Sequence, residues 1–225
     1  MSIADNLAQV RARIVAAAAA AGRDPATVRL IAVSKVQPVD AIRAALDAGQ
    51  VDFGENYAQE LRDKADLLGP TPRWHFIGAL QRNKVKYVVG RAELVHDVDS
   101  LALAEELGKR ALPRAIGVLL GVNIGREDQK SGVLPEACLE LAHAVHRIPG
   151  VALRGLMCIP PADCDPAPPF AALAALAASG RAEGLPLDTL SMGMSHDYEV
   201  AIAHGATLVR VGTAIFGARP PKPVG

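Results

Sequence analysis

The sequence is poor in aromatic residues and in net charge, and both shortages narrow the classes of protein it can belong to. Aromatic residues make up 4% of the 225 residues, although half of all residues are hydrophobic. We therefore expect one compact domain, residues 1–225, with a core of Ala, Val, Leu and Ile. Lys plus Arg equals Asp plus Glu, 24 of each, so no overall field attracts nucleic acid or an anionic membrane. Partners should be small molecules or locally recognised proteins.

Cysteines and long apolar runs are also scarce. Cys138, Cys158 and Cys164 are odd in number and lack a C-x-x-C spacing, which favours reduced thiols in the cytoplasm over disulfide bonds. No apolar run approaches the ~20 residues needed to span a bilayer. Residues 14–21 could imitate a signal peptide, but the apolar residues of 3–14 repeat on one helical face. We expect an amphipathic first helix, a cytoplasmic location and no membrane partner.

Beyond that helix, short apolar runs alternate with helical patterns. The predicted strands are residues 30–35, 51–54, 74–77, 92–96, 116–123, 151–159, 187–192 and 208–211. The predicted helices are residues 39–48, 58–68, 81–89, 101–111, 135–148, 170–178 and 197–204. Residues 125–132 and 160–169 are predicted loops to which the sequence assigns no role. About eight doubly buried strands alternating with helices predict an α/β fold, a single (β/α)8 TIM-type barrel with an extra N-terminal helix. A doubly wound open sheet is the alternative, but no G-x-G-x-x-G follows the first strand.

Lys35 stands at the end of the first predicted strand. A lysine held near apolar walls has a lowered pKa, and its neutral amine can form a Schiff base with an aldehyde. The alternative is a lysine whose long stem reaches to water. The other candidate residues favour the first interpretation.

Two turns rich in glycine and hydroxyl groups follow the last two strands. The first is residues 191–195, with Ser191, Met192, Gly193 and Ser195, and the second contains Gly212 and Thr213. In barrels of this type the loops after strands seven and eight often bind phosphate. Since strands one and eight are neighbours in a closed barrel, the sequence predicts an amine beside a phosphate site. Pyridoxal 5′-phosphate offers an aldehyde and a phosphate on one molecule.

Arg210 lies within the last predicted strand, where an unpaired guanidinium would be costly to bury. An arginine only donates hydrogen bonds, so opposite a pyridine nitrogen it would keep that nitrogen unprotonated and weaken the ring as an electron sink. The alternative is a salt bridge from Arg210 to a barrel carboxylate such as Glu55.

Five segments together resemble the pyridoxal phosphate homeostasis protein family, which is related to the N-terminal barrel of alanine racemase. They are residues 32–35 (AVSK), 53–57 (FGENY), 75–84 (HFIGALQRNK), 190–195 (LSMGMS) and 210–217 (RVGTAIFG). The likeness extends over essentially the whole chain, and residues 75–84 are its most specific part.

The resemblance implies a role for each matched residue. Lys35 would form the internal aldimine, Arg210 would meet the pyridine nitrogen, and Asn56 would line the ring. The residues around the phosphate would be Ser191, Gly193, Ser195, Gly212 and Thr213, with Met192 in the same turn. The family is credited with binding and buffering the cofactor in vitamin B6 homeostasis rather than with an established reaction. We therefore expect no catalytic residues, a monomer, and apo-enzymes as recipients of the cofactor.

Histidines and a basic patch offer weaker candidates. His75 could be a general base, but an imidazole within a strand is more often a packed core residue. His143 and His146 have helical i, i+3 spacing without further ligands, so we predict no metal site. Arg82, Lys84 and Lys86 form a patch too small to imply nucleic acid.

Two other functions fit a reactive lysine on a barrel. One is a pyridoxal-phosphate racemase or decarboxylase, which we disfavour because such a racemase has a second domain and the barrel uses all 225 residues. The other is a cofactor-free aldolase, which would be colourless where a pyridoxal phosphate protein is yellow. These alternatives remain open from the sequence alone.

Overall fold

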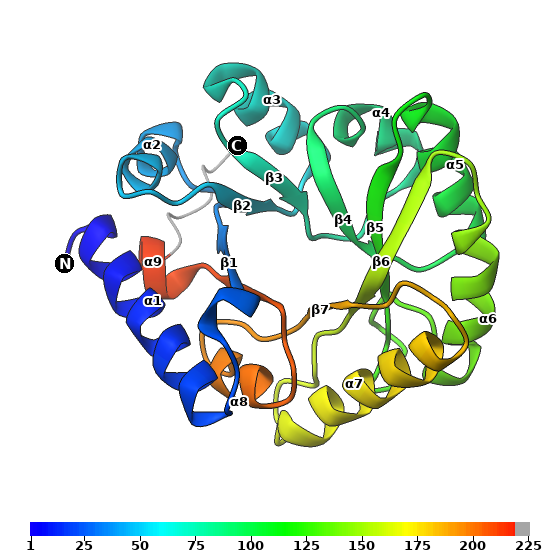
Figure 1. Cartoon of the computed structure of the whole chain (residues 1–225). Helices are drawn as coiled ribbons and strands as arrows, with labels where there is room; N and C mark the ends of the chain where they lie inside the picture. The colour runs from blue at the N-terminus through cyan, green and yellow to red at the C-terminus, as the bar shows by residue number, and fades with distance from the viewer. Residues whose placement is uncertain (219–225) are drawn as a thin grey trace.

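The protein is a closed barrel of eight parallel strands, as the computed structural model of residues 1–218 shows (Figure 1). Each strand pairs with the next in the chain, and β8 pairs with β1. The strands are β1 (Arg29–Val33), β2 (Asp52–Glu55), β3 (Arg73–Phe76), β4 (Ala92–Val98), β5 (Ile116–Gly121), β6 (Val151–Met157), β7 (Thr189–Ser191) and β8 (Leu208–Val211). The predicted TIM-type barrel is therefore confirmed, and the open doubly wound sheet is excluded.

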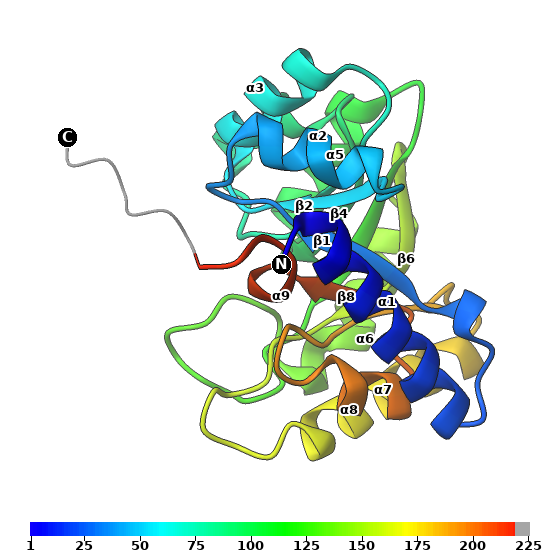
Figure 2. The same cartoon turned by 90° about the vertical axis from the view of Figure 1, so that its left-hand side faces the viewer.

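Helices surround the barrel (Figure 1). They are α1 (Ile3–Ala20), α2 (Val39–Asp47), α3 (Ala58–Leu68), α4 (Val85–Val88), α5 (Leu101–Ala111), α6 (Pro135–His146), α7 (Ala167–Ala182), α8 (Tyr198–Ala203) and α9 (Thr213–Phe216). Short 3-10 turns, η1 (Pro25–Thr27) and η2 (Arg82–Lys84), precede β1 and α4. The extra N-terminal helix is confirmed. It packs against α8, α9 and α2 on the outside of the barrel (Figure 2).

Two predicted helices differ from the observed ones. The helix predicted at 170–178 is longer in the structure, because α7 begins at Ala167 with the side chain of Asp165 accepting its N–H at 3.0 Å. Pro168 and Pro169 stand in the first turn, where a helix needs no N–H donors, so they extend the helix rather than break it. The helix predicted at 81–89 is only the turn η2 followed by the single-turn α4.

The buried residues form two layers. The larger one lies between the barrel and the helices and includes Phe53, Phe76, Phe170 and Leu107. The second lies inside the barrel and contains Ile31, Leu94, Leu119, Met157 and Leu208. Alternate residues of β2, β3, β4, β7 and β8 face the interior of the barrel. Several of these inward-facing residues are polar. These inward-facing polar residues are Asp52, His75, His96, Ser191 and Arg210, all buried.

No helix among residues 1–218 is long and apolar enough to cross a membrane. Cys138 and Cys158 are buried thiols, and Cys164 is exposed. Burial in apolar surroundings raises the pKa of both buried thiols to about 12, which makes them structural rather than reactive.

The contact between β6 and β7 depends on a glycine. A Cβ at Gly155 would lie 1.8 Å from the carbonyl oxygen of Thr189, its register partner. We predict that Gly155→Ala lowers the free energy of unfolding by at least about 1–3 kcal/mol, because backbone must move to admit the methyl group.

Urea denaturation followed by circular dichroism measures this loss. Ala152→Ser, at a partly exposed position of the same strand, is the control and should stay within about 0.5 kcal/mol of the wild type. An alanine variant as stable as that control would contradict the predicted clash.

Candidate functional site

Lys35 lies in a tight turn rather than in the strand. Strand β1 ends at Val33, two residues earlier than predicted, and Lys35 is half-buried. The next residue, Val36, has φ +58°, a conformation that a β-branched side chain strongly disfavours. Such strain persists only when surrounding contacts impose it, and it concentrates at functional sites.

Helix α3 supplies the contacts that impose this turn. Lys64 Nζ donates to the carbonyl oxygen of Ser34 at 2.7 Å, and the carboxylate of Glu60 accepts the N–H of Val36 at 2.7 Å. Lys64 also binds Glu60 at 2.6 Å. Backbone groups on both sides of Lys35 are therefore held by side chains of one helix. The sequence does not indicate this role, since Glu60 and Lys64 have the i, i+4 spacing of an ordinary surface pair.

Glu55 completes this cluster beneath the turn. Its Oε1 accepts hydrogen bonds from Ser34 Oγ at 2.6 Å and from Lys64 Nζ at 2.8 Å. Burial raises the pKa of Glu55 to about 7, although Lys64 acts in the opposite direction. The predicted alternative of a salt bridge from Arg210 to Glu55 is wrong, because the cation beside Glu55 is Lys64.

Arg210 crosses the barrel interior at the register position opposite Ile31 of β1. It is only 4% exposed and donates to Ser191 Oγ at 2.5 Å and to the carbonyl oxygen of Cys158 at 3.0 Å. Desolvation lowers the pKa of Arg210. Within residues 1–218 no carboxylate lies in ion-pair contact with it, so its charge is met there by uncharged acceptors.

The turns after β7 and β8 touch one another. Thr213 Oγ1 donates to Ser195 Oγ at 3.1 Å. Gly193 has φ +93°, and its carbonyl oxygen accepts the N–H of Arg210. In the described part of the chain, the N–H groups of Gly193, Ser195, Gly212 and Thr213 donate to no other residue. The structure thus brings hydroxyl groups and available N–H donors together next to β1, as the sequence predicted.

Ser191 and Met192 differ from the rest of their turn. The Ser191 hydroxyl points into the barrel, where it binds Arg210 and His96. Met192 is fully buried in the outer core, and its N–H donates to Leu208. The structure therefore brings neither the hydroxyl of Ser191 nor the side chain of Met192 to the surface of the turn.

Asn56 follows β2 at the same end of the barrel. Its Oδ1 is buried and has no hydrogen-bond partner among the residues that the structure describes. The residue lines a cavity of about 400 Å³ with Tyr57, Gly78 and Lys84. A second cavity, of about 250 Å³, is lined by Asp97, Asn123 and Lys130, among other residues of the β4, β5 and β6 ends.

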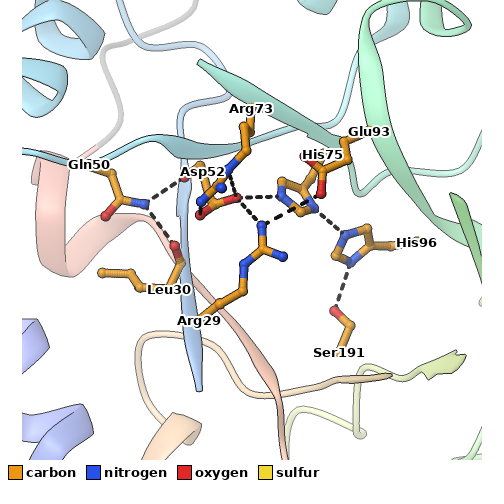
Figure 3. A network of polar contacts seen from close by, with 9 residues as sticks. All are labelled: Arg29, Leu30, Gln50, Asp52, Arg73, His75, Glu93, His96 and Ser191. Carbon is orange, nitrogen blue, oxygen red and sulfur yellow. Dashed lines mark hydrogen bonds and ion pairs between the residues drawn. The ribbon is translucent and has the colours of Figure 1, made fainter. Parts of the chain in front are cut away.

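Asp52 lies at the opposite end of the barrel, at the start of β2. Its carboxylate binds Arg29 at 2.5 Å and Arg73 at 2.7 Å, and it contacts His75 Nε2 at 3.1 Å (Figure 3). Burial alone would raise the pKa of Asp52, but the hydrogen bonds from His75, Arg73 and Arg29 outweigh it and hold that pKa well below its usual range. Asp52 is ionised at neutral pH.

Two buried histidines join Asp52 to the other end of the barrel. His75 Nδ1 lies 3.0 Å from His96 Nε2, and His96 Nδ1 lies 2.8 Å from Ser191 Oγ (Figure 3). Both rings are fully buried. The prediction of His75 as a packed core residue agrees with its burial, but the sequence did not point to His96 or Asp52. His96 stands between Val95 and Asp97, all three of them buried, so alternation with apolar neighbours does not mark it as inward-facing.

No group of three His, Cys, Asp or Glu residues within 1–218 could hold a metal ion. His143 is partly exposed and binds Glu183 at 2.7 Å. His146 is exposed.

Comparison with known proteins identifies the family. The family model of the alanine racemase N-terminal domain matches residues 5–220. The pyridoxal phosphate homeostasis protein of Pseudomonas aeruginosa is 50% identical over 222 residues, which are 97% of this chain and 96% of that protein. Its counterpart in Escherichia coli K12 is 48% identical over 227 residues, or 96% and 97% of the two chains. The chain belongs to the pyridoxal phosphate homeostasis protein family.

Solved structures agree with this family membership. PipY of Synechococcus elongatus, solved with PLP bound, superposes with a TM-score of 0.83 at 37% identity and covers 96% of this chain and 100% of its own. Alanine racemase of Corynebacterium glutamicum has a TM-score of 0.72 at 18% identity, and 62% of its chain is covered. That second likeness shows a shared fold.

The buried carboxyl of Glu55 predicts a pH dependence of stability. Its proton is bound more tightly in the folded protein than in the unfolded chain, where an exposed glutamate has its ordinary pKa of 4.5. The folded state therefore holds an extra proton between pH 4.5 and about 7. The free energy of unfolding should fall by up to about 3 kcal/mol as pH rises through this window.

Glu55→Gln keeps the acceptor for Lys64 and Ser34 and should flatten this slope. Urea unfolding between pH 4 and pH 8 measures it. Glu140→Gln, on the exposed side of α6, should retain the wild-type profile. A slope that survives in Glu55→Gln would mean that another group holds the proton.

Proposed function

We propose that this protein binds pyridoxal 5′-phosphate at the carboxyl ends of its strands and buffers or delivers it in vitamin B6 homeostasis. The observation that carries this proposal is the guanidinium of Arg210, which is buried next to the two contacting turns and bonded to neutral acceptors. Relatives at about 50% identity are named for this role, and the related PipY was solved with PLP bound.

The residues present fit the cofactor. When bound, pyridoxal phosphate supplies an aldehyde that bonds to a lysine amine, a ring nitrogen that accepts a hydrogen bond, and a phosphate dianion. Lys35 is the proposed covalent attachment, and Arg210 the donor to the ring nitrogen. The proposed phosphate site is formed by the turn residues Gly193, Ser195, Gly212 and Thr213, whose N–H groups and hydroxyls are suited to an anion.

Asn56, Ser191 and Met192 have lesser parts in this proposal. The buried Oδ1 of Asn56, which no described residue contacts by a hydrogen bond, lies at the end of β2, next to the turn of Lys35, where it would contact the ring. Ser191 would not contact the cofactor but would orient Arg210, which donates a hydrogen bond to its hydroxyl. Met192 would contribute to the turn only through its backbone.

We infer that the bound cofactor is held rather than used for efficient turnover. Catalysis on amino acids needs the ring to accept electrons, and a carboxylate beside the ring nitrogen favours this by keeping the nitrogen protonated. Arg210 instead donates to the nitrogen and gives up no proton at neutral pH. The ring is thus left a weak electron sink.

We also propose the domain organisation, the oligomeric state and the location of the protein. The strands of the single barrel extend from Arg29 to Val211, so we propose that residues 1–225 form one cofactor-binding domain. We also propose that the protein is a monomer. The three cysteines are free thiols, which suits a reducing cytoplasm. Apo-enzymes that need the cofactor are the proposed recipients. Light scattering of the purified protein would test the monomer.

The first prediction concerns Lys35. Borohydride reduction of the cofactor-loaded protein should fix the cofactor to Lys35, and peptide mass spectrometry identifies the modified residue. Lys84 and Lys130, which line the two neighbouring cavities, should stay unmodified. An adduct on either of them, with Lys35 unmodified, would reject the assignment.

The second prediction separates the covalent bond from the other contacts. Lys35→Ala should lose the visible absorbance band but retain part of the affinity, because each charge-assisted hydrogen bond to the phosphate contributes roughly 1.5–3 kcal/mol without the amine. Equilibrium dialysis measures the affinity. Complete loss of binding in a folded variant would show that the turns contribute less than proposed.

The third prediction concerns activity. The loaded protein should racemise or decarboxylate amino acids far below ordinary enzyme rates of about 1–10³ s⁻¹, yet reactivate an apo-aminotransferase. Chiral chromatography of L-alanine and a coupled aminotransferase assay measure the two. Turnover within the ordinary range would favour a racemase or decarboxylase instead.

A further inference from the structure

Five polar side chains inside the barrel form one continuous hydrogen-bond chain between its two ends, and Figure 3 shows the part from Asp52 to Ser191. In order, the contacts are Arg210 to Ser191 at 2.5 Å, Ser191 to His96 at 2.8 Å, His96 to His75 at 3.0 Å and His75 to Asp52 at 3.1 Å. All five side chains are buried. The chain enters from β8 near the cofactor site and ends on β2 at the opposite mouth.

The charges at the two ends determine the direction of every hydrogen bond. Asp52 is ionised and only accepts, so the nitrogen facing it, His75 Nε2, holds the proton. A neutral His75 then accepts at Nδ1, and the donor must be His96 Nε2. This leaves His96 Nδ1 as the acceptor of the Ser191 hydroxyl proton, while Ser191 Oγ accepts from Arg210.

Other arrangements cost more. If His75 held its proton on Nδ1, an unprotonated Nε2 would face the carboxylate of Asp52. If His75 held two protons, His96 would reverse, and the Ser191 hydroxyl would face two donors, Arg210 and His96 Nδ1. A second buried cation would then also join Arg210 in the interior.

We propose that Asp52, His75 and His96 are positioning residues that orient Arg210 through a one-directional hydrogen-bond chain with both imidazoles neutral and protonated on Nε2. This rests on the proposed function only for what Arg210 faces. Each link polarises the next, so the negative charge of Asp52 is felt at Ser191 and makes that hydroxyl a better acceptor for the guanidinium.

The surroundings of His96 keep its imidazole neutral. The groups that face His96 are His75 on β3, Ser191 on β7 and Arg210 on β8, with Arg29 on β1 further away. Burial first, and then the electrostatic effects of His75, Arg210 and Arg29, lower the pKa of His96 well below its ordinary value. At the N-terminal end of the barrel, Arg29 and Arg73 bind Asp52. Asp52, the anionic end of the hydrogen-bond chain, therefore lies far from the proposed cofactor site.

Long-range ¹H–¹⁵N spectra of the histidines test the direction of the chain directly, with and without pyridoxal phosphate. His75 and His96 should both appear as neutral rings protonated on Nε2 between pH 7 and pH 8. An Nδ1-protonated ring, or a charged ring in this range, would overturn the proposal. Because these spectra do not need the cofactor, a protein that failed to bind it would count against the proposed function alone.

Two substitutions at His96 test positioning apart from packing. His96→Asn offers an amide oxygen close to the place of Nδ1 and should keep the affinity for pyridoxal phosphate within about threefold of the wild type. His96→Phe offers no acceptor to Ser191 and should weaken binding about tenfold, the effect of one charge-linked hydrogen bond. Equal weakening in both variants, or none in His96→Phe, would overturn the proposal.

Asp52→Asn provides a second test of the proposal if His96→Phe does not fold. Without the carboxylate the single tautomer should be lost, and a second set of signals should appear for His75 and His96. Unchanged spectra would overturn the proposal. His143→Asn, a partly exposed histidine outside the chain, is the control and should alter neither the other histidine signals nor the affinity.

Discussion

A guanidinium inside a closed barrel imposes the main constraint on this structure. Removing such a charge from water costs several kcal/mol even after relaxation, and no carboxylate of the described chain contacts Arg210 to offset that cost. Neutral acceptors meet it instead, the carbonyl oxygen of Cys158 and the hydroxyl of Ser191. The hydroxyl of Ser191 is in turn bonded to the buried His96, so polar contacts continue from Arg210 into the barrel interior.

The turn of Lys35 is stabilised from the other side of the sheet. Glu55 and the α3 residues Glu60 and Lys64 lie between the barrel and the helices and hold the backbone around Lys35. The two systems share no residue. The position of the amine and the position of the guanidinium are therefore set independently, one from outside the barrel and one from within it.

The sequence predicted the parts of this arrangement that local patterns determine. Apolar runs located all eight strands, and chain order in a parallel barrel placed Lys35 beside the turns with Ser195 and Thr213. It could not predict which buried groups pair, because that depends on strand register and tilt. The sequence therefore suggested Glu55 as a partner of Arg210, whereas Glu55 binds Lys64. His96 and Asp52 were not predicted, because a single polar residue within a strand does not indicate its partner.

The hydrogen bonds inside the barrel also limit which side chains can exchange protons. Rapid chemistry on an amino acid needs a titratable group placed to exchange protons with the substrate near neutral pH. In the interior below Arg210, the two buried imidazoles are occupied at each nitrogen by contacts with each other, with Ser191 or with Asp52. No proton of this network can leave without breaking one of these contacts.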